Sequence, residues 1–235
     1  MTRPCASIAS GVVESFIQCK VTMMEVSVGL REANKARTRL AISDVATHLF
    51  IERGFEKVTV AEIAEAAHVS VKTVFNYFAS KEELFFDRAD DVRDAMLEAI
   101  RQRPEGVDAL EAIRALLADR LVAFELDGWR PLRNPERYEQ FRSFIAAEHA
   151  SPALRARRLV IAEQWTGAFA DVFESELGDR RAAHALAAMV IGIVGLRERE
   201  LSSAMLERAS ARTVERRVRA VVDEGFTRLA RAFDT

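Results

Sequence analysis

Three helix-start signals follow one another within one short stretch of this chain. Thr59 is followed three residues later by Glu62, and Ser80 is followed in the same way by Glu83. In this pattern, a capping box, the hydroxyl accepts a hydrogen bond from the third helical amide and the carboxylate reaches back to the helix start. Ser70 lies between the two pairs and is a third candidate N-cap. These caps leave room only for very short helices between them.

The caps predict a helix over residues 60–67, a sharp turn, a helix over 71–78, and a further helix that starts at Lys81. Two helices this short, separated by so few residues, cannot lie antiparallel side by side, so they have to cross steeply as in a helix-turn-helix. The side chains that can point into the crossing are apolar or small: Val60, Ile63, Ala64, Ala67, Val69, Val74 and Phe78.

The outer face of the second short helix has a different character. It is left with Lys72, Thr73, Asn76 and Tyr77, which are long or hydrogen-bonding side chains. Such side chains suit base edges and phosphates in a major groove. Taken alone, they also fit an ordinary solvated helix face, and the charge of the neighbouring segment favours DNA.

Charge along the chain is uneven. The whole molecule is close to neutral, with 34 basic and 36 acidic residues, so any contact with nucleic acid has to come from a local patch. The segment Arg31–Arg39 has four basic residues and one acidic residue, and arms of this kind follow the phosphate backbone or enter the minor groove. Arg37 is therefore a candidate DNA contact. A first helix, predicted over about residues 33–53, ends at Gly54.

The stretch Phe55–Leu84, FEKVTVAEIAEAAHVSVKTVFNYFASKEEL, resembles the DNA-binding segment of the TetR family of bacterial regulators. The resemblance covers residues 30–84 and implies a homodimeric regulator that binds DNA. His68 stands where the family usually has a turn glycine, a position that tends to need a positive φ.

The resemblance also implies roles for single residues. Thr59 would cap the second helix at a phosphate, and Lys81 would meet the DNA backbone from the start of the fourth helix. The recognition helix would run from Ser70 to Tyr77, which adds Ser70 and Val71 to the candidate DNA contacts.

The sequence divides into three parts. Residues 1–29 show no clear period and predict a flexible extension, residues 30–84 form the DNA-binding domain, and residues 85–235 form a larger helical body. No alternating pattern typical of a strand appears downstream, so the predicted class is all-α. The resemblance implies that the body binds a small-molecule effector and dimerises.

Two long helices of the body have wide apolar faces. One opens at Ser151-Pro152 and the other spans about residues 211–233. Their width predicts a symmetric four-helix interface between two copies, and hence a palindromic operator. A monomer with a thick core is the alternative. The predicted interface residues are Trp165, Phe169, Val222, Phe226, Leu229 and Phe233.

A pocket for the effector is predicted among the middle helices. The candidates for its lining are Phe124, Trp129, Phe141, Phe144, Trp165, Met189 and Ile193. Each of these also fits a plain core position, because aromatic and Met residues at helical spacing are common in cores. The polar groups placed to orient a ligand are His149, His184 and Arg197.

Composition narrows the class of protein. With 49% apolar and 30% charged residues and few Gly or Pro, the chain is typical of a soluble helix-rich protein. The longest uncharged stretch, residues 182–196, is shorter than the roughly 20 residues of a membrane span. Cysteine occurs only at Cys5 and Cys19, with no zinc-like spacing. We therefore expect a cytoplasmic protein with no membrane contact.

The alternative to a regulator is a helical-bundle enzyme or ligand-binding protein without DNA contact. A carboxylate-bridged metal pair needs two Glu-x-x-His motifs on facing helices. One occurs, Glu65 to His68, and it crosses the predicted turn. There is no Gly-rich phosphate loop and no His-Glu-x-x-His motif. We expect no enzymatic activity, no catalytic residues, no cofactor and no metal, and we favour a ligand-responsive repressor.

Overall fold

The computed structural model describes residues 32–119 and 130–233. After a helix over residues 32–53, the elements are α2 (Val60–Ala66), α3 (Val71–Tyr77), α4 (Lys81–Phe85), α5 (Ala89–Arg101), α6 (Ala109–Asp119), the 3-10 turn η1 (Arg130–Arg133), α7 (Pro135–Ala150), α8 (Pro152–Leu177), α9 (Arg180–Leu206) and α10 (Ala211–Phe233). Within these ranges every regular element is a helix, which confirms the predicted all-α class. The predicted extension over residues 1–29 lies outside them.

The predicted caps form where the sequence placed them, with one difference. Thr59 accepts a hydrogen bond from the Glu62 amide while the Glu62 carboxylate accepts one from the Thr59 amide, a complete capping box. Ser80 caps α4, but the Glu83 carboxylate accepts from the amide of Ala79, at 2.8 Å, and not from that of Ser80. The second box is therefore shifted outward by one residue.

The turn between α2 and α3 depends on one left-handed residue. His68 has φ 53° and follows the helix cap Ala67. The His68 amide donates to the Glu65 carbonyl at 3.1 Å and the Val69 amide donates to the Ala64 carbonyl at 2.9 Å. This pair of bonds is a Schellman motif, which satisfies the last carbonyls of α2 and reverses the chain. The expected positive φ at His68 is confirmed.

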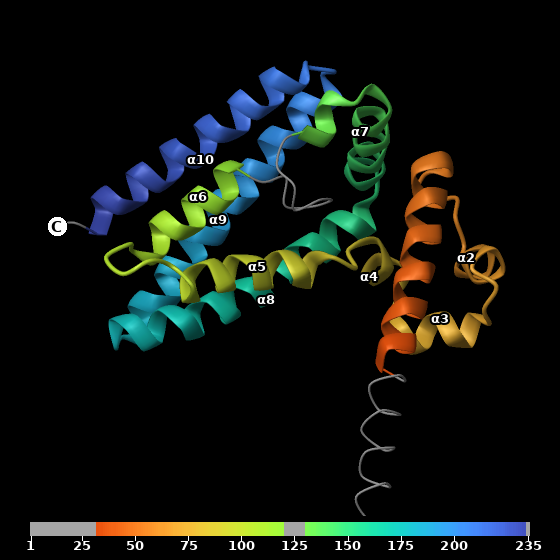
Figure 1. Ribbon diagram of the computed structural model, residues 1–235, viewed down its shortest axis with the longest axis horizontal. Helices are drawn as coiled ribbons and strands as arrows, with labels where there is room; N and C mark the ends of the chain where they lie inside the picture. Colours follow the sequence, from red (N-terminus) through yellow and green to blue (C-terminus); the bar gives the residue numbers. More distant parts are fainter. Residues whose placement is uncertain (1–31, 120–129, 234–235) are drawn as a thin grey trace, which may run out of the picture.

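The N-terminal helices lie on one side of the molecule and the body on the other (Figure 1). The N-terminal core contains Ile42, Ala46, Phe50, Phe55, Val58, Ile63, Ala64, Val74, Phe78, Leu84 and Phe85, all buried. Two residues of the body, Phe144 of α7 and Leu154 of α8, complete this core. The two halves of the chain therefore share one apolar cluster.

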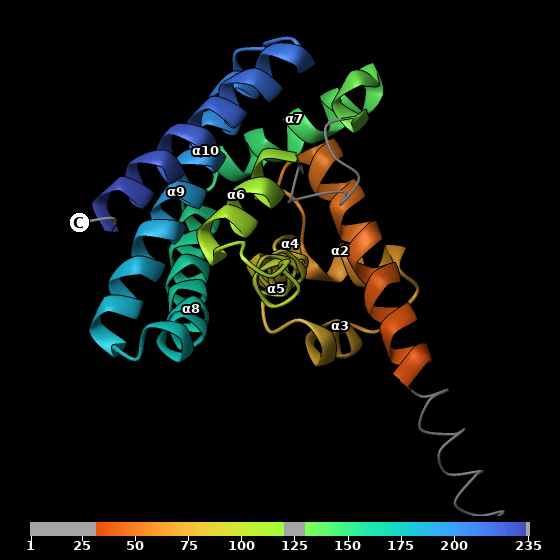
Figure 2. The same ribbon diagram turned by 60° about the vertical axis from the view of Figure 1, so that its left-hand side comes forward.

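The body is built on long helices that pack lengthwise. α8 and α9 lie side by side, and α10 packs on α9 and on α6 (Figure 2). At Gly225 the α10 backbone comes so close to α9 that an added Cβ would lie 2.9 Å from Cγ2 of Ile193. The chain therefore covers one side of α9 with its own last helix.

This packing corrects the interface predicted from the sequence. The wide apolar face of α10 is covered by helices of the same chain. Trp165, Phe169, Val222, Phe226 and Leu229 are all buried within one copy. The side chain of Phe233 lies outside the described part. A surface that pairs two copies has to use other residues.

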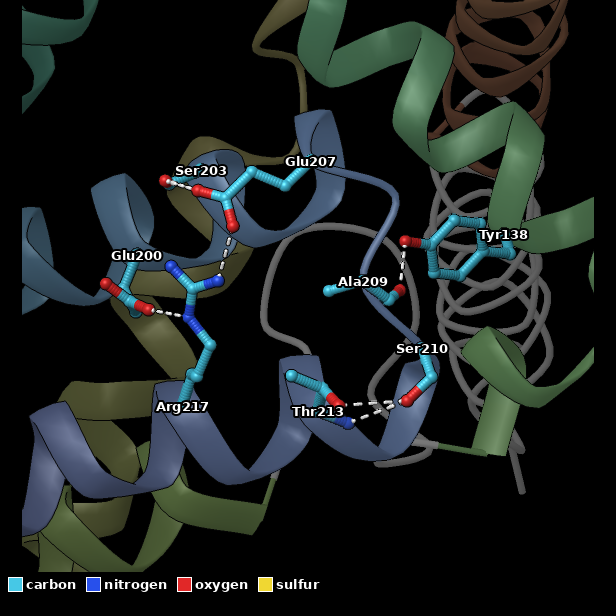
Figure 3. A network of polar contacts seen from close by, with 8 residues as sticks. All are labelled: Tyr138, Glu200, Ser203, Glu207, Ala209, Ser210, Thr213 and Arg217. Atoms are coloured by element: carbon cyan, nitrogen blue, oxygen red, sulfur yellow. Dashed lines mark hydrogen bonds and ion pairs between the residues drawn. The ribbon is translucent and has the colours of Figure 1, made fainter.

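The α9–α10 junction is held by a polar network (Figure 3). Arg208 has φ 58°, a second left-handed turn residue without glycine. The Tyr138 hydroxyl donates to the Ala209 carbonyl at 2.5 Å, and Arg217 of α10 donates to Glu200 and Glu207. These bonds fix the angle at which α10 returns along the body.

Candidate nucleic-acid interface and interdomain cavity

Helix α3, the predicted recognition helix, presents four side chains to solvent. Val71, Lys72, Phe75 and Asn76 are exposed, with Phe75 at 50% and Val71 at 40%. Val71, Lys72 and Asn76 were predicted contacts, whereas Phe75 was not. The exposure of Phe75 could have been predicted from its place one residue before Asn76, because Val74 already fills the side of α3 that faces the core. An exposed aromatic side chain here suits apolar contact with a base edge.

The other predicted DNA contacts of α3 are less exposed or are engaged in local hydrogen bonds. Thr73 and Tyr77 are half-buried, and Tyr77 packs against the N-terminal core. Ser70 caps the helix by accepting from the Thr73 amide at 3.0 Å, and the two hydroxyls lie 2.7 Å apart. The exposed outer face of α3 is therefore narrower than the sequence indicated, and it includes Phe75.

Lys81 has a different setting from the phosphate contact that the resemblance implies. Its ammonium donates to the carbonyls of Phe55 at 3.0 Å and Val58 at 3.1 Å. The same nitrogen lies 4.1 Å from the centre of the Phe55 ring, a cation–π contact. Lys81 therefore holds the loop before α2 against the start of α4.

The basic segment is part of a helix rather than an arm before one. Residues 32–39 continue into the helix that ends at residue 53. Lys35 and Arg37 are exposed on it, and Arg37 donates to the Asn34 side chain at 3.0 Å. Arg39 is half-buried, with its guanidinium 5.0 Å from the centre of the Phe78 ring. The exposed positive charge is thus carried on a rigid element.

Thr59 was predicted to cap α2 next to a DNA phosphate. It is exposed, and its hydroxyl is already hydrogen-bonded within its own capping box. The hydrogen bond from its backbone amide, with further bonds from Arg53 and from the Thr59 side chain, lowers the pKa of Glu62 to about 2. Arg53 reaches this carboxylate at 2.6 Å from the end of the first helix. The negative charge of Glu62 is therefore fixed at the start of α2.

A cavity of about 350 Å³ lies between the N-terminal helices and the body. The first helix contributes Ser43, Asp44, Thr47 and His48, and the α4–α5 region contributes residues 85–89. Helices α5 to α9 supply the remaining walls. A molecule in this cavity would touch both halves of the chain.

Three predicted pocket residues, Phe141, Phe144 and Trp165, line this cavity. Arg197, predicted as a polar group for the ligand, also lines it and is fully buried. Met189 points to solvent, and Ile193 packs against Gly225, so neither belongs to the cavity wall.

Other predictions fall elsewhere. His149 and His184 are exposed and do not line this cavity. Phe124 and Trp129 lie outside the described residues. The sequence did not predict that residues of the first helix line the cavity. The residue pattern of this helix does not distinguish a cavity wall from an exposed turn.

Four charged residues that line the cavity form two ion pairs, whereas Asp44 and Arg88 line it from exposed positions. Arg158 of α8 forms a two-point contact with Glu148 of α7, one of its bonds being 2.6 Å long. Arg197 of α9 donates to Glu198 at 2.5 Å and to the Leu117 carbonyl at 3.3 Å. The Arg158 guanidinium also lies 5.3 Å from the centre of the Phe86 ring, so paired charges and aromatic rings share the lining.

Asp87 joins the two halves of the chain at the cavity edge. It accepts a hydrogen bond from the Ser43 hydroxyl, and its backbone carbonyl accepts one from Arg39 at 3.0 Å. Burial raises the pKa of the Asp87 carboxyl, and the Ser43 hydrogen bond opposes this shift. The α4–α5 turn is therefore tied to the first helix by polar contacts.

The α7–α8 corner forms a second tie. Ser151, fully buried, is the single residue between the two helices and accepts from the Leu154 amide at 3.3 Å. Its hydroxyl donates to Glu56 of the loop before α2. Together with Phe144 and Leu154 in the shared core, this bond anchors the body to the N-terminal helices.

Two further features bear on function. Among the residues described, no group of three His, Cys, Asp or Glu side chains is placed to hold a metal ion. No helix in the described ranges combines the length and apolar character needed to cross a membrane.

Comparison with known proteins assigns the N-terminal segment. Residues 42–87 match the family described as bacterial regulatory proteins, tetR family. The HTH-type transcriptional regulator TcmR of Streptomyces glaucescens is 39% identical over 104 residues, which are 43% of this chain and 46% of that protein. The HTH-type transcriptional regulator LuxR of Vibrio harveyi is 42% identical over 59 residues, covering 22% of this chain and 29% of that protein.

A longer match reaches into the body. The HTH-type transcriptional repressor NicS of Pseudomonas putida is 28% identical over 137 residues, which are 58% of this chain and 59% of that protein. The chain thus spans less than two thirds of the length of each of these relatives. All three are named as transcriptional regulators or repressors.

Proposed function

Because residues 42–87 match the tetR family of bacterial regulatory proteins, we propose that this chain is a TetR-family regulator, a homodimeric, ligand-responsive repressor that binds a palindromic operator in the cytoplasm. Residues 30–84 are its DNA-binding domain, and residues 85–235 are its effector-binding and dimerisation domain. The observation that carries this proposal is the exposed outer face of α3, which follows a Schellman turn at His68.

The DNA contacts fall into two kinds. Val71, Phe75 and Asn76 are placed to read base edges, since all three are exposed on one short helix. Lys72 and the basic side chain of Arg37 supply phosphate contacts, which position a protein on DNA without reading sequence. Ser70, Thr73, Thr59 and Tyr77 then contribute mainly by shaping α2 and α3.

Dimerisation is proposed through α8 and α9. The outer face of α9 carries an exposed row of apolar and small residues: Ala185, Ala188, Met189, Gly192 and Leu196. α8 beside it exposes Leu159 at 73% and Val160 at 47%. Small residues let helices approach closely, and an apolar face of this extent is typical of an association surface. Two such pairs would form a four-helix interface.

The cavity is proposed as the effector site. It is bounded by the first helix and by the body, so a ligand that prefers one arrangement of these parts shifts the spacing of the two recognition helices in the dimer. Coupling energies of this kind are typically about 1–3 kcal/mol. The name of NicS, a repressor, supports repression as the sign of control.

A gel-shift titration tests the proposal. Purified protein is titrated into DNA from upstream of its own gene at two salt concentrations, with a scrambled duplex as control. Specific binding is expected to saturate at two chains per site and to weaken steeply with salt, because each phosphate contact releases counterions. Equal binding to the scrambled duplex at both salt concentrations would contradict the proposal.

Sedimentation tests the pairing surface separately. Leu196→Glu places a charge in the α9 row and is expected to give monomers, whereas Arg216→Glu, on an exposed position of α10 outside the proposed surface, leaves the dimer intact. A Leu196→Glu protein that remains dimeric would move the interface away from α9.

A further inference from the structure

We propose that the cavity takes an uncharged aromatic molecule with hydrogen-bonding groups along one edge, bound among the rings and the paired charges that line it. This rests on the proposed function of the cavity as an effector site. The inference follows from the chemistry of the side chains that line the cavity and from its volume.

One wall is aromatic. Five rings line the cavity: Phe85, Phe86, Phe141, Phe144 and Trp165. They come from α4, the turn after it, α7 and α8, so they converge from separate elements rather than from one helix face. Aromatic side chains favour offset or edge contacts with other rings, which add to the apolar area they bury. This wall selects a ring system over a flexible alkyl chain.

The charged residues that line the cavity from α7, α8 and α9 are matched in pairs. Arg158 is engaged by both carboxylate oxygens of Glu148, and Arg197 is engaged by Glu198. The side chain of Arg197 is only 1% exposed, so its charge depends on these contacts rather than on water. An anionic ligand would have to displace a carboxylate already in place, and a cationic ligand would have to displace a guanidinium.

A net charge on the ligand would therefore be costly. A charge moved from water into a protein interior needs a partner there, and breaking a buried ion pair leaves another charge uncompensated. The cavity also holds Asp87, whose carboxyl is occupied by the Ser43 hydroxyl. The hydroxyls and carboxylate oxygens around these pairs still offer hydrogen bonds to neutral hydroxyl or carbonyl groups.

The cavity volume limits the ligand to a small molecule. About 350 Å³ lies at the low end of the range of small-molecule sites, roughly 300–1,000 Å³. A fused two-ring molecule is a suitable probe.

The test uses three naphthalene probes that share a ring system and differ in charge. 2-Naphthol is neutral at neutral pH, 2-naphthoate is anionic and 2-naphthylmethylammonium is cationic. Their binding to the full chain is measured by calorimetry, with decan-1-ol as a neutral probe without a ring. 2-Naphthol is expected to bind about tenfold or more tightly than each of the other three, a difference of about 1.4 kcal/mol.

Two variants locate the binding. Ile161→Trp fills the cavity from α8 and is expected to abolish 2-naphthol binding, whereas Ala115→Trp, on the exposed side of α6, leaves it unchanged. If Ile161→Trp does not fold, Val194→Phe fills the same space from α9. Binding that survives a folded cavity-filling variant overturns the proposal.

The remaining outcomes are also decisive. Tighter binding of the naphthoate or of the ammonium probe overturns the proposal, because a charge pair must then have yielded to the ligand. Binding of decan-1-ol as tight as that of 2-naphthol removes the role of the rings. If the protein binds its operator but none of the probes, the proposed ligand class is overturned and the proposed regulatory function is not. Cavity-dependent 2-naphthol binding without operator binding supports the ligand class and counts against the regulator.

Discussion

The rings of Phe85 and Phe144 are stacked, with centroids 4.0 Å apart and planes 14° from parallel. Phe85 ends α4 and lies within the family-matched residues 42–87, and Phe144 belongs to α7 of the body. Both rings line the cavity, and both belong to the N-terminal core. A change in the cavity that separates the two rings must therefore also disturb the core that positions α2 and α3.

The first prediction concerns this stack. Phe144→Leu keeps an apolar side chain but removes the ring, so operator binding without ligand is expected to stay within about threefold while the effect of a ligand on DNA release falls about tenfold or more. The measurement is operator affinity with and without 2-naphthol. Phe173→Leu, which removes another buried ring of the body that does not line the cavity, is the control. Equal loss of response in both variants would assign the effect to general packing.

A second prediction separates two aromatic residues of α3. Phe75→Ala is expected to weaken operator binding with little change in thermal stability, because the ring is 50% exposed. Tyr77→Ala is expected to lower the melting temperature as well, because Tyr77 packs against the N-terminal core. Gel shifts and thermal melts of both variants make the comparison. Full operator affinity in Phe75→Ala would remove Phe75 from the reading face.

The third prediction compares two lysines. Lys81→Met removes two hydrogen bonds to carbonyls and a cation–π contact, so it is expected to lower the free energy of unfolding by about 1–3 kcal/mol. Lys72→Met is expected to leave stability unchanged and to reduce the salt dependence of operator binding by about one phosphate contact. Denaturant unfolding and salt titrations check both. If Lys81→Met, and not Lys72→Met, reduced the salt dependence of operator binding, Lys81 would be the phosphate contact and Lys72 would not.

A fourth prediction tests the contact between α9 and α10. Gly225→Ala places a Cβ 2.9 Å from Ile193 Cγ2, and such overpacking costs about 1–3 kcal/mol, partly offset by the better helix propensity of alanine. Ile193→Ala also destabilises the body but makes room for the added methyl group. The double variant is therefore expected to be more stable than the sum of the two changes by about 0.5–3 kcal/mol. Strict additivity would show that α10 shifts away instead.

The fifth prediction is a pH dependence. The pKa of Glu62 is about 2 in the folded chain, against an ordinary value of 4.5. A lowered folded pKa means that the ionised carboxylate stabilises the fold at pH values above 4.5, and that this stability is lost as the pH falls from 4.5 toward 2. Glu62→Gln is expected to be less stable than the parent near neutral pH, and the difference should shrink across this window. Glu65→Gln, exposed on the same helix, is the control. A gap between parent and Glu62→Gln that stays constant with pH would contradict this account.

Local features were predictable, and tertiary ones were not. The caps at Thr59, Ser70 and Ser80 act within one helical turn, so the residue pattern is enough to place them. The role of Lys81 was not predictable, because its hydrogen bonds go to the carbonyls of Phe55 and Val58, which only the folded loop brings close to it.

The helices of the body also show that tertiary contacts were not predictable from the residue pattern. The wide apolar face of α10 correctly indicated burial, but a pattern of apolar residues does not tell a neighbour in the same chain from a second copy. The Phe226 ring is buried by its own subunit, whereas the exposed row on α9, with Met189 and Leu196, looked like core in the sequence. The cavity includes Ser43 of the first helix because the chain folds back on itself over a long sequence distance.

A cavity walled by both halves of the chain has a thermodynamic consequence. If a bound molecule weakens the hold on DNA by some factor, then bound DNA must weaken the hold on that molecule by the same factor. Protein seated on its operator would release the small molecule more readily than protein free in solution. The response threshold of the cell would then depend on how many operator copies compete for the protein.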